Sequence, residues 1–156
     1  MENPKRIGKY ELEELLGGGM SHVYRARDTV IGRTVAIKIL TAEASKDPEA
    51  KARFLREAQM AGNLAHENVM SVYDFGEADG RPFMVMEFLR GEDLRSRIKS
   101  GRVGDKTARL QIALRIARAL EYIHNQKIIH RDIKPENIHV HTSGTVKLMD
   151  FGIAKT

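Results

Sequence analysis

Residues 129–137 bring together three side chains with complementary chemistry, Asp132, Lys134 and Asn137. The carboxylate of Asp132 could accept a proton, and the ammonium of Lys134 could neutralise growing negative charge. The side-chain oxygen of Asn137 could hold a metal ion. Phosphoryl transfer needs this set of groups, because its catalysis consists mostly of positioning and electrostatic stabilisation. The alternative for so short an acidic and basic stretch is a solvated turn, and the sequence around it decides between the two.

The composition bounds the class of protein. With 156 residues, 42% of them hydrophobic and 30% charged, the chain is predicted to be globular and to form one domain or part of a larger one. The sequence has no cysteine, which excludes disulfides and thiolate metal sites and suits the cytoplasm. No signal peptide is visible, and no stretch approaches the ~20 apolar residues of a membrane span. We therefore expect a cytoplasmic location, with a membrane anchor beyond residue 156 left open.

The net charge of +5 raises the question of an anionic partner. The Lys and Arg residues are spread along the chain among Glu and Asp, and no basic block carries interleaved aromatic residues that would stack on bases. The six histidines show no paired helical spacing for zinc. We therefore expect no nucleic-acid partner and no zinc site.

The first part of the chain is predicted to be an antiparallel sheet. Strand-like segments at residues 10–12, 22–27 and 34–40 are separated by turn residues. Gly17, Gly18 and Gly19 lie between the first two strands, where glycine amides can approach phosphate oxygens without a side chain in the way. A flexible hairpin turn is the alternative for this glycine run.

A helix is predicted to follow, with Asp47 as its N-cap and Pro48 at its first position. Its apolar stripe extends to Leu64, and Glu57 lies beside that stripe. A carboxylate so placed is costly to bury unless it meets a cation, and Lys38 is the expected partner. The alternative is an exposed glutamate in a helical pair.

Two more strands, residues 69–74 and 82–87, are predicted on either side of a turn at residues 76–80. The loop at residues 90–93 would then be a hinge, so we expect a β-rich first part that ends at residue 89. Such an arrangement is an α+β fold.

The second part is predicted to be helical, with a short helix at 94–99 and a long one at 107–125. The long helix is apolar over most of its circumference, which indicates a helix inside a larger domain. A hairpin through residues 142–144 leads to a strand and then to residues 150–152. We expect part of the long helix to remain an exposed apolar face, through which the chain could self-associate.

Four motifs in order resemble those of eukaryotic-type protein kinases. Residues 129–137 match the catalytic loop, residues 35–38 the strand with the phosphate-binding lysine, Glu57 the glutamate of helix C, and residues 150–152 the D-F-G segment. The sequence from Tyr10 onward resembles the bacterial serine/threonine branch of this family.

That resemblance implies an antiparallel β lobe with helix C, followed by the first part of a helical lobe. The domains would be a tail at 1–9, an N-lobe at 10–89 and a partial C-lobe at 90–156. The protein would transfer the γ-phosphoryl group of ATP to a serine or threonine hydroxyl of a protein substrate. The implied cofactors are ATP and Mg²⁺.

The resemblance also assigns the nucleotide-binding residues. The glycines would cover the phosphates, Met86 would be the gatekeeper, and Asp93 would bond the ribose. The full set is Leu16, Gly17, Gly18, Gly19, Val23, Ala36, Lys38, Met86, Glu87, Leu89, Asp93 and His139.

The catalytic residues implied in the same way are Asp132, Lys134, Lys38 and Glu57. Asp132 would accept the proton of the substrate hydroxyl, and Lys134 would stabilise the transferring group. Asn137 and Asp150 would coordinate Mg²⁺. Arg131 resembles the arginine that pairs with a phosphorylated activation loop.

The sequence departs from the family pattern in three places. The glycine loop is one residue short, since Val23 follows Gly17 by six positions. His139 occupies a position where the family has an apolar residue under the adenine, so its ring would stack on the base or be an exposed strand histidine. The sequence ends at Thr156, so we expect an N-terminal fragment without turnover of its own. The alternative function is a truncated nucleotide-binding or pseudokinase-like regulatory module.

Overall fold

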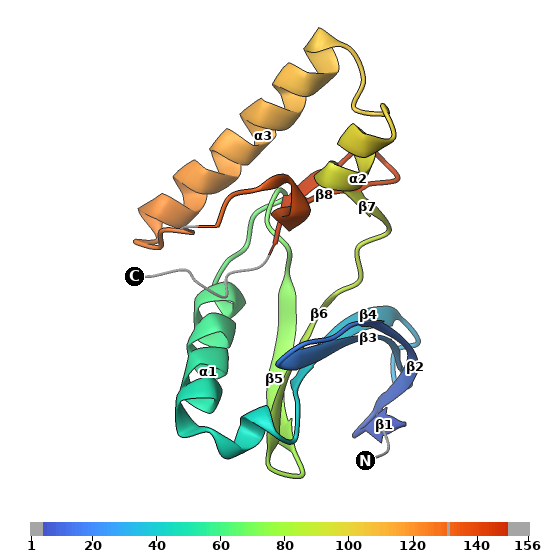
Figure 1. Ribbon diagram of the computed structural model, residues 1–156, viewed down its shortest axis with the longest axis vertical. Helices are drawn as coiled ribbons and strands as arrows, with labels where there is room; N and C mark the ends of the chain where they lie inside the picture. Colours follow the sequence, from blue (N-terminus) through green and yellow to red (C-terminus); the bar gives the residue numbers. More distant parts are fainter. Residues whose placement is uncertain (1–4, 131, 150–156) are drawn as a thin grey trace. The chain divides into compact units, whose positions relative to one another are not determined.

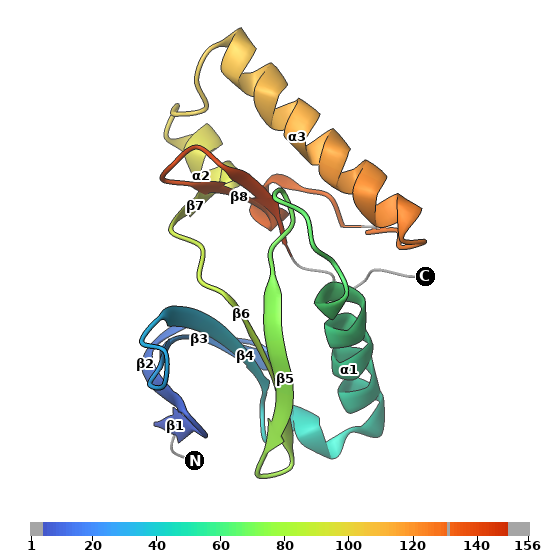
Figure 2. The same cartoon turned by 180° about the vertical axis from the view of Figure 1, so that it is seen from behind.

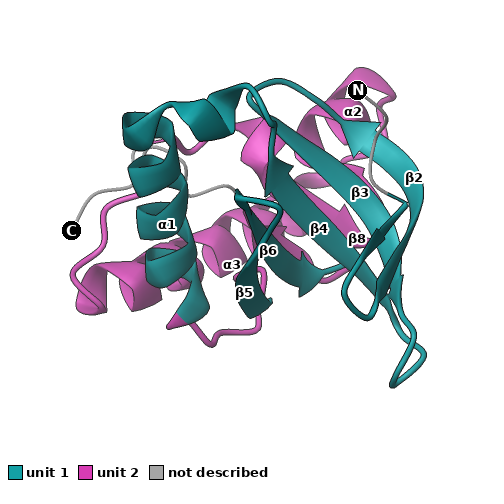
Figure 3. Ribbon diagram, turned by 90° about the horizontal axis from the view of Figure 1, so that it is seen from below, with its two compact units in different colours: residues 1–62, 72–88 teal, residues 63–71, 89–156 magenta. Residues whose placement is uncertain are grey.

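The computed structural model describes residues 5–130 and 132–149, which form two compact units. Figure 3 shows the first unit, residues 1–62 and 72–88, in teal and the second, residues 63–71 and 89–156, in magenta. The sequence predicts domain limits at residues 9 and 89. Whether the chain folds as domains with these limits stays a prediction.

The first unit contains a six-stranded antiparallel sheet. The sequence predicts its antiparallel strands except β1, which lies in the predicted tail and pairs with β2. The strand order is β1-β2-β3-β4-β6-β5 (Figure 1). The strands are β1 (Arg6–Ile7), β2 (Tyr10–Gly17), β3 (Ser21–Asp28), β4 (Thr34–Leu40), β5 (Val72–Ala78) and β6 (Arg81–Glu87).

The two faces of this sheet have different compositions. Tyr24 of β3 pairs with Ile37 of β4, and both lie in a buried apolar cluster. Because side chains alternate along a strand, the neighbours Val23 and Lys38, which also pair, lie on the opposite face. The cluster consists of Ile7, Tyr10, Tyr24, Ala26, Val35, Ile37, Ile39 and Val85. One face therefore holds the core of the unit, and the other carries Lys38.

Helix α1 (Pro48–Gly62) follows a short 3-10 turn, η1 (Ala44–Lys46), and packs along β5 (Figures 1 and 2). The carboxylate Oδ1 of Asp47 accepts a hydrogen bond from the backbone N–H of Glu49 at 3.0 Å, which confirms the predicted cap. Phe54, Glu57 and Ala61 are buried on the face of the helix that the sequence predicts.

Strand β5 differs from the prediction, which ended it at residue 74 and began the turn at Gly76. The strand continues through Gly76, where a Cβ atom would lie 2.7 Å from Cζ of Phe83. The glycine thus makes room for an aromatic ring on the neighbouring strand and does not break its own. The turn comes later, at Asp79 and Gly80, whose φ angles are 52° and 75°.

The second unit contains a three-stranded antiparallel sheet in the order β7-β8-β9 and two helices. Its elements are β7 (Gly91–Asp93), α2 (Leu94–Lys99), α3 (Lys106–Asn125), the 3-10 turn η2 (Pro135–Asn137), β8 (Ile138–His141) and β9 (Val146–Leu148). Both predicted helices are present. The predicted loop at residues 90–93 is instead mostly strand β7, because these residues pair with β8.

Residues 63–71 belong to the second unit although they follow α1. The backbone N–H of Ala65 donates to the hydroxyl of Tyr122 at 2.8 Å, and the ring of His66 lies 5.1 Å from that of Tyr122. Nδ2 of Asn68 donates to the backbone oxygen of Val146 at 2.8 Å. The sequence predicted a strand from Val69, but β5 begins only at Val72. Val69 instead forms an isolated parallel bridge with Leu148 of β9, whose backbone N–H donates to the backbone oxygen of Asn68 at 2.8 Å.

Helix α3 buries only part of its apolar surface. Ile116, Ala119 and Ile123 are buried, whereas Leu110 and Leu114 are exposed, as the apolar circumference predicts. Among the described residues, no helix combines the length and the hydropathy that crossing a membrane requires.

Asp28 makes folding stability depend on pH. Its Oδ1 accepts the backbone N–H groups of Val30 and Ile31, and its Oδ2 lies 3.6 Å from Nζ of Lys9. Burial acts to raise the pKa of Asp28, but these two amides and the ammonium group outweigh it and hold the pKa below its ordinary value.

Because the folded-state pKa is lowered, the stabilisation is complete above the unfolded-state pKa and is lost as pH falls through the folded-state pKa. We expect Asp28→Ala to lower the free energy of unfolding at pH 7. The difference from the original protein should shrink as the pH falls below about 4. Urea unfolding over a pH series measures this, and a difference that stays constant would contradict the assignment.

Candidate functional site

An ion pair joins β4 to α1. Nζ of Lys38 donates to Oε1 of Glu57 at 2.8 Å, and the two side chains are 20% and 11% exposed. Nζ also lies 6.0 Å from the centre of the Phe54 ring. The expected partner of Glu57 is therefore present, and the alternative of an exposed glutamate is wrong. The pair fixes a cation on the sheet face opposite the core.

Three further residues of the predicted nucleotide set lie on the same face of this sheet. Val23 pairs with Lys38, and Ala36 pairs with Met86 across β4 and β6. Ala36 and Met86 are buried. Glu87 is the last residue of β6 and pairs with Val35. Their contacts to a nucleotide stay predictions.

The short glycine loop closes the hairpin between β2 and β3. Gly17 is the last residue of β2 and pairs with Val23, and Gly19 has a φ angle of 146°. A Cβ atom on Gly18 would lie 3.5 Å from the ring of His22, so this histidine lies against the loop. Leu16 is exposed just before the loop. A phosphate role for the loop stays a prediction.

The predicted catalytic loop gathers two side chains around the carboxylate of Asp132. Nδ2 of Asn137 donates to Oδ2 of Asp132 at 3.0 Å and to its backbone oxygen at 2.9 Å. Nζ of Lys134 lies 3.5 Å from the same Oδ2. Asn137 comes into place because η2 turns the chain back after Lys134. The three residues that the sequence singled out therefore meet in space.

His130 is a residue to which the sequence assigned no role. It is fully buried, and its Nδ1 accepts the backbone N–H of Asp132 at 3.1 Å. Its Nε2 then carries the proton and donates to the backbone oxygen of Met149 at 3.1 Å. His130 thus links the backbone of Asp132 to the residue before Asp150. The signal in the sequence was its place directly before Arg131 and Asp132, in the stretch that resembles the catalytic loop.

Asp93 and His139 are opposite each other on β7 and β8. Oδ1 of Asp93 accepts the backbone N–H of Ser96 at 2.7 Å and caps α2. His139 is 9% exposed, and its Nε2 lies 3.2 Å from the backbone oxygen of Arg90. The alternative of an exposed strand histidine is therefore wrong. Leu89, half-buried, begins this part of the second unit. Their nucleotide contacts stay predictions.

Two predicted site residues, Arg131 and Asp150, lie outside the described residues. Asn137 is suited to a hard cation, because its amide nitrogen is directed to Asp132 and its side-chain oxygen remains the group for a metal. Within residues 5–130 and 132–149, no group of three His, Asp or Glu side chains could hold a metal ion.

Comparison with known proteins places this geometry in a family. A family model described as protein kinase domain matches residues 10–156. A probable serine/threonine-protein kinase of Streptomyces coelicolor is 47% identical over 99% of this chain and 24% of its own length. The serine/threonine-protein kinase PrkC of Bacillus subtilis is 44% identical over 96% of this chain and 24% of its own length.

A third relative, the probable serine/threonine-protein kinase PknB of Corynebacterium glutamicum, is 43% identical over 94% of this chain and 24% of its own length. The chain thus spans about a quarter of the length of these curated relatives. The family match confirms the predicted α+β kinase fold, a β lobe with one helix and the beginning of a helical lobe. The chain belongs to the protein kinase domain family.

Proposed function

We propose that this chain carries the ATP-binding and catalytic residues of a serine/threonine protein kinase. The observation that carries the proposal is the grouping of Lys134 and Asn137 around the carboxylate of Asp132. Membership of the family implies ATP, a divalent metal ion and a protein substrate. The serine/threonine preference is supported by the names of the relatives and by Lys134.

The chemistry assigned to Asp132 is that of a general base. Its carboxylate accepts the proton of a serine or threonine hydroxyl while the hydroxyl oxygen attacks the γ-phosphorus of ATP. The bond between this phosphorus and the β–γ bridging oxygen breaks, and ADP leaves. Lys134, whose Nζ lies 3.5 Å from Oδ2 of Asp132, stabilises the negative charge of the transferring group.

Asn137 and Asp150 are the residues that would hold Mg²⁺, whose charge offsets the negative charge on the phosphate oxygens. In the first unit, Lys38 binds the phosphates and Glu57 fixes its ammonium group at 2.8 Å. The three glycines, Gly17, Gly18 and Gly19, would cover the phosphates. Glu87 and Leu89 would bind the base, and Asp93 would bond the ribose. The ring of His139 would stack on the adenine.

Transfer of radioactive phosphate from Mg-ATP to a generic basic protein tests the proposal directly. Transfer that is lost in Asp132→Asn would support the enzyme. The alternative, a nucleotide-binding regulatory module without turnover, is supported if Mg-ATP binds but no phosphate is transferred. If Mg-ATP does not bind and no phosphate is transferred, both proposed functions are contradicted.

Nucleotide binding should stabilise the chain through Lys38. At a concentration 100-fold above its Kd, Mg-ATP adds about 2.7 kcal/mol to the free energy of unfolding, or roughly 8 °C in Tm for a chain of this size. We expect Lys38→Met to remove most of this shift, whereas Lys99→Met, which changes an exposed lysine on α2, should keep it. An equal shift in both variants, measured by calorimetry, would contradict the role of Lys38.

We further propose that the chain acts in the cytoplasm and self-associates through the exposed part of α3. Leu110 and Leu114, one helical turn apart, are 60% and 51% exposed. The double variant Leu110→Glu with Leu114→Glu should shift the mass measured by light scattering toward the monomer. Arg118→Glu, farther along the helix, is the control. A monomeric original chain at high concentration would refute self-association.

A further inference from the structure

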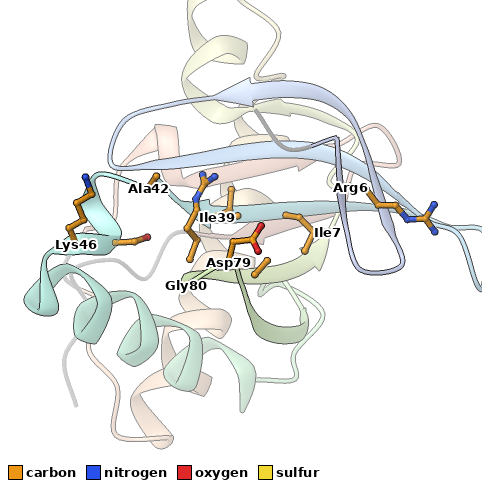
Figure 4. A pocket seen from close by; sticks show the side chains of 10 residues that line it. Arg6, Ile7, Ile39, Ala42, Lys46, Asp79 and Gly80 are labelled. Carbon is orange, nitrogen blue, oxygen red and sulfur yellow. The ribbon is translucent and has the colours of Figure 1, made fainter. Parts of the chain in front are cut away.

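The first unit contains a cavity on the core side of the sheet, away from Lys38. Its volume is about 570 Å³, in the size range of small-molecule sites. It is open to solvent and is lined by residues of β1, β4, the segment around η1 and the β5–β6 hairpin (Figure 4). The lining residues are Arg6, Ile7, Ile39, Ala42, Ser45, Lys46, Ala78, Asp79, Gly80 and Arg81. None of them belongs to the predicted nucleotide or catalytic set.

The charges around this cavity favour an anion. Three cationic side chains, Arg6, Lys46 and Arg81, line it with a single acid, Asp79. None of the three cations forms an ion pair within the described ranges 5–130 and 132–149. In Figure 4, Lys46 lies at one end and Arg6 at the other, with Ile7, Ile39 and Asp79 between them.

Arg81 is the best-placed of the three cations. Its Nε donates to the backbone oxygen of Leu40 at 2.9 Å, which fixes the guanidinium at the end of β4. A guanidinium has five N–H donors, so four remain for other groups. A planar donor fork of this kind matches the two oxygens of a carboxylate or phosphate.

The buried hydroxyl of Tyr24 also lacks a partner. Tyr24 is 4% exposed, and its hydroxyl makes no hydrogen bond among the residues that the structure describes. Burial raises the pKa of Tyr24, and the cation of Arg81 acts in the opposite direction, so the two groups are within electrostatic reach. A buried hydroxyl without a partner is costly, and Arg81, the cation that acts on it, also lines the cavity.

The remaining wall is apolar. Ile7 and Ile39 are almost fully buried, and Ala42 and Ala78 add methyl groups beside them. An inorganic ion alone would leave this wall without contacts, and a neutral apolar molecule would leave the cations without a counter-charge. We propose that this cavity binds a small organic oxyanion, a phosphate or carboxylate joined to a short apolar group.

An NMR titration of the isotope-labelled chain tests the site with phenyl phosphate and benzoate. We expect saturable shifts of the backbone amides of Ala42, Lys46 and Gly80, with a millimolar Kd because the probes have few atoms. Phenol and inorganic phosphate should each bind at least fivefold more weakly. The proposal would be overturned if phenol or inorganic phosphate bound as tightly as phenyl phosphate. It would also be overturned if the shifted backbone amides all lay outside the cavity.

Four variants distinguish binding in the cavity from non-specific binding to charges on the surface. Lys46→Glu should weaken phenyl phosphate about tenfold, whereas Lys99→Glu should change the Kd less than twofold. Asp79→Asn should tighten binding about threefold, because it removes the single negative charge at the cavity. Asparagine also tolerates the φ angle of 52° at this position, so the turn should be kept. Ala42→Leu should block the site by filling it. Equal effects of the two lysine variants would overturn the proposal, provided that thermal unfolding shows all four folded.

Saturating Mg-ATP distinguishes this cavity from the proposed nucleotide site. Because Lys38 and the cavity residue Ile39 lie on opposite faces of the sheet, the Kd of phenyl phosphate should be the same with and without the nucleotide. Lys38→Met should likewise leave it unchanged. Displacement of phenyl phosphate by ATP would overturn the proposal, whereas failure of ATP to bind would affect only the proposed kinase function.

Discussion

Any phosphate transfer to a protein substrate is expected to fall about 10²–10⁴-fold in Asp132→Asn, the usual contribution of a general base. The amide cannot accept the hydroxyl proton at neutral pH. Its side-chain oxygen can still accept the hydrogen bond from Nδ2 of Asn137. The loss should therefore be chemical, with little change in folding. Initial rates with radioactive ATP measure it.

Two controls make this result specific. Asp79→Asn makes the same chemical change in a turn of the first unit and should retain the full rate. Calorimetry of Asp132→Asn should show a Tm within about 1 °C of the original chain and an unchanged shift with Mg-ATP. A rate that falls less than tenfold would contradict the assignment of Asp132 as the base.

Gly91→Ala is expected to be the most damaging substitution outside the catalytic loop. Gly91 has a φ angle of 119°, and an added Cβ atom would collide with the backbone oxygen of Val140. Two more backbone atoms, in His141 and Thr142, lie 3.1 Å away. Backbone atoms in a sheet cannot move aside as a flexible side chain can. We expect a loss of at least about 3 kcal/mol in the free energy of unfolding.

The matched control is Gly101→Ala. Gly101 also has a positive φ angle, 70°, but no atom lies within 4 Å of an added Cβ. It should therefore show only the backbone strain, about 1 kcal/mol. Urea unfolding measures the free energy of unfolding of both variants. The extra loss in Gly91→Ala reports the collision of the added Cβ atom with β8. Equal losses would mean that the pairing of β7 with β8 adapts to the side chain.

The collision also bears on the proposed nucleotide site. β7 pairs with β8 through Gly91–His141 and Asp93–His139, so a displaced Gly91 would shift the register that places Asp93 opposite His139. We therefore expect Gly91→Ala, where it remains folded, to weaken Mg-ATP more than Gly101→Ala does.

Local sequence was enough to predict the groups that meet in the catalytic loop. Asp132, Lys134 and Asn137 lie within six residues, and Pro135 starts the turn that brings Asn137 back to Asp132. The helix cap at Asp47 and the antiparallel strands likewise follow from short-range residue preferences. The ion pair of Lys38 and Glu57 was predicted because a buried carboxylate needs a cation.

Tertiary structure decided the features that depend on distant partners. Gly76 is a strand residue because Phe83 packs over it, and residues 63–71 join the second unit through Tyr122 and Val146. His130 gains its positioning role only because the backbone of Met149 lies beside it. Burial, the assignment of a hydrogen-bond partner and the choice of sheet face are set by side chains far apart in sequence, and no local pattern encodes them.

The cavity beneath β4 illustrates the same division. Its cations come from β1, the segment around η1 and β6, and no spacing in the sequence relates Arg6, Lys46 and Arg81. The sequence by itself determined the chemistry of the catalytic loop, because its groups are neighbours along the chain. Only the folded sheet decided that Lys38 and the cavity lie on opposite faces, because strand pairing fixes which side chains share a face.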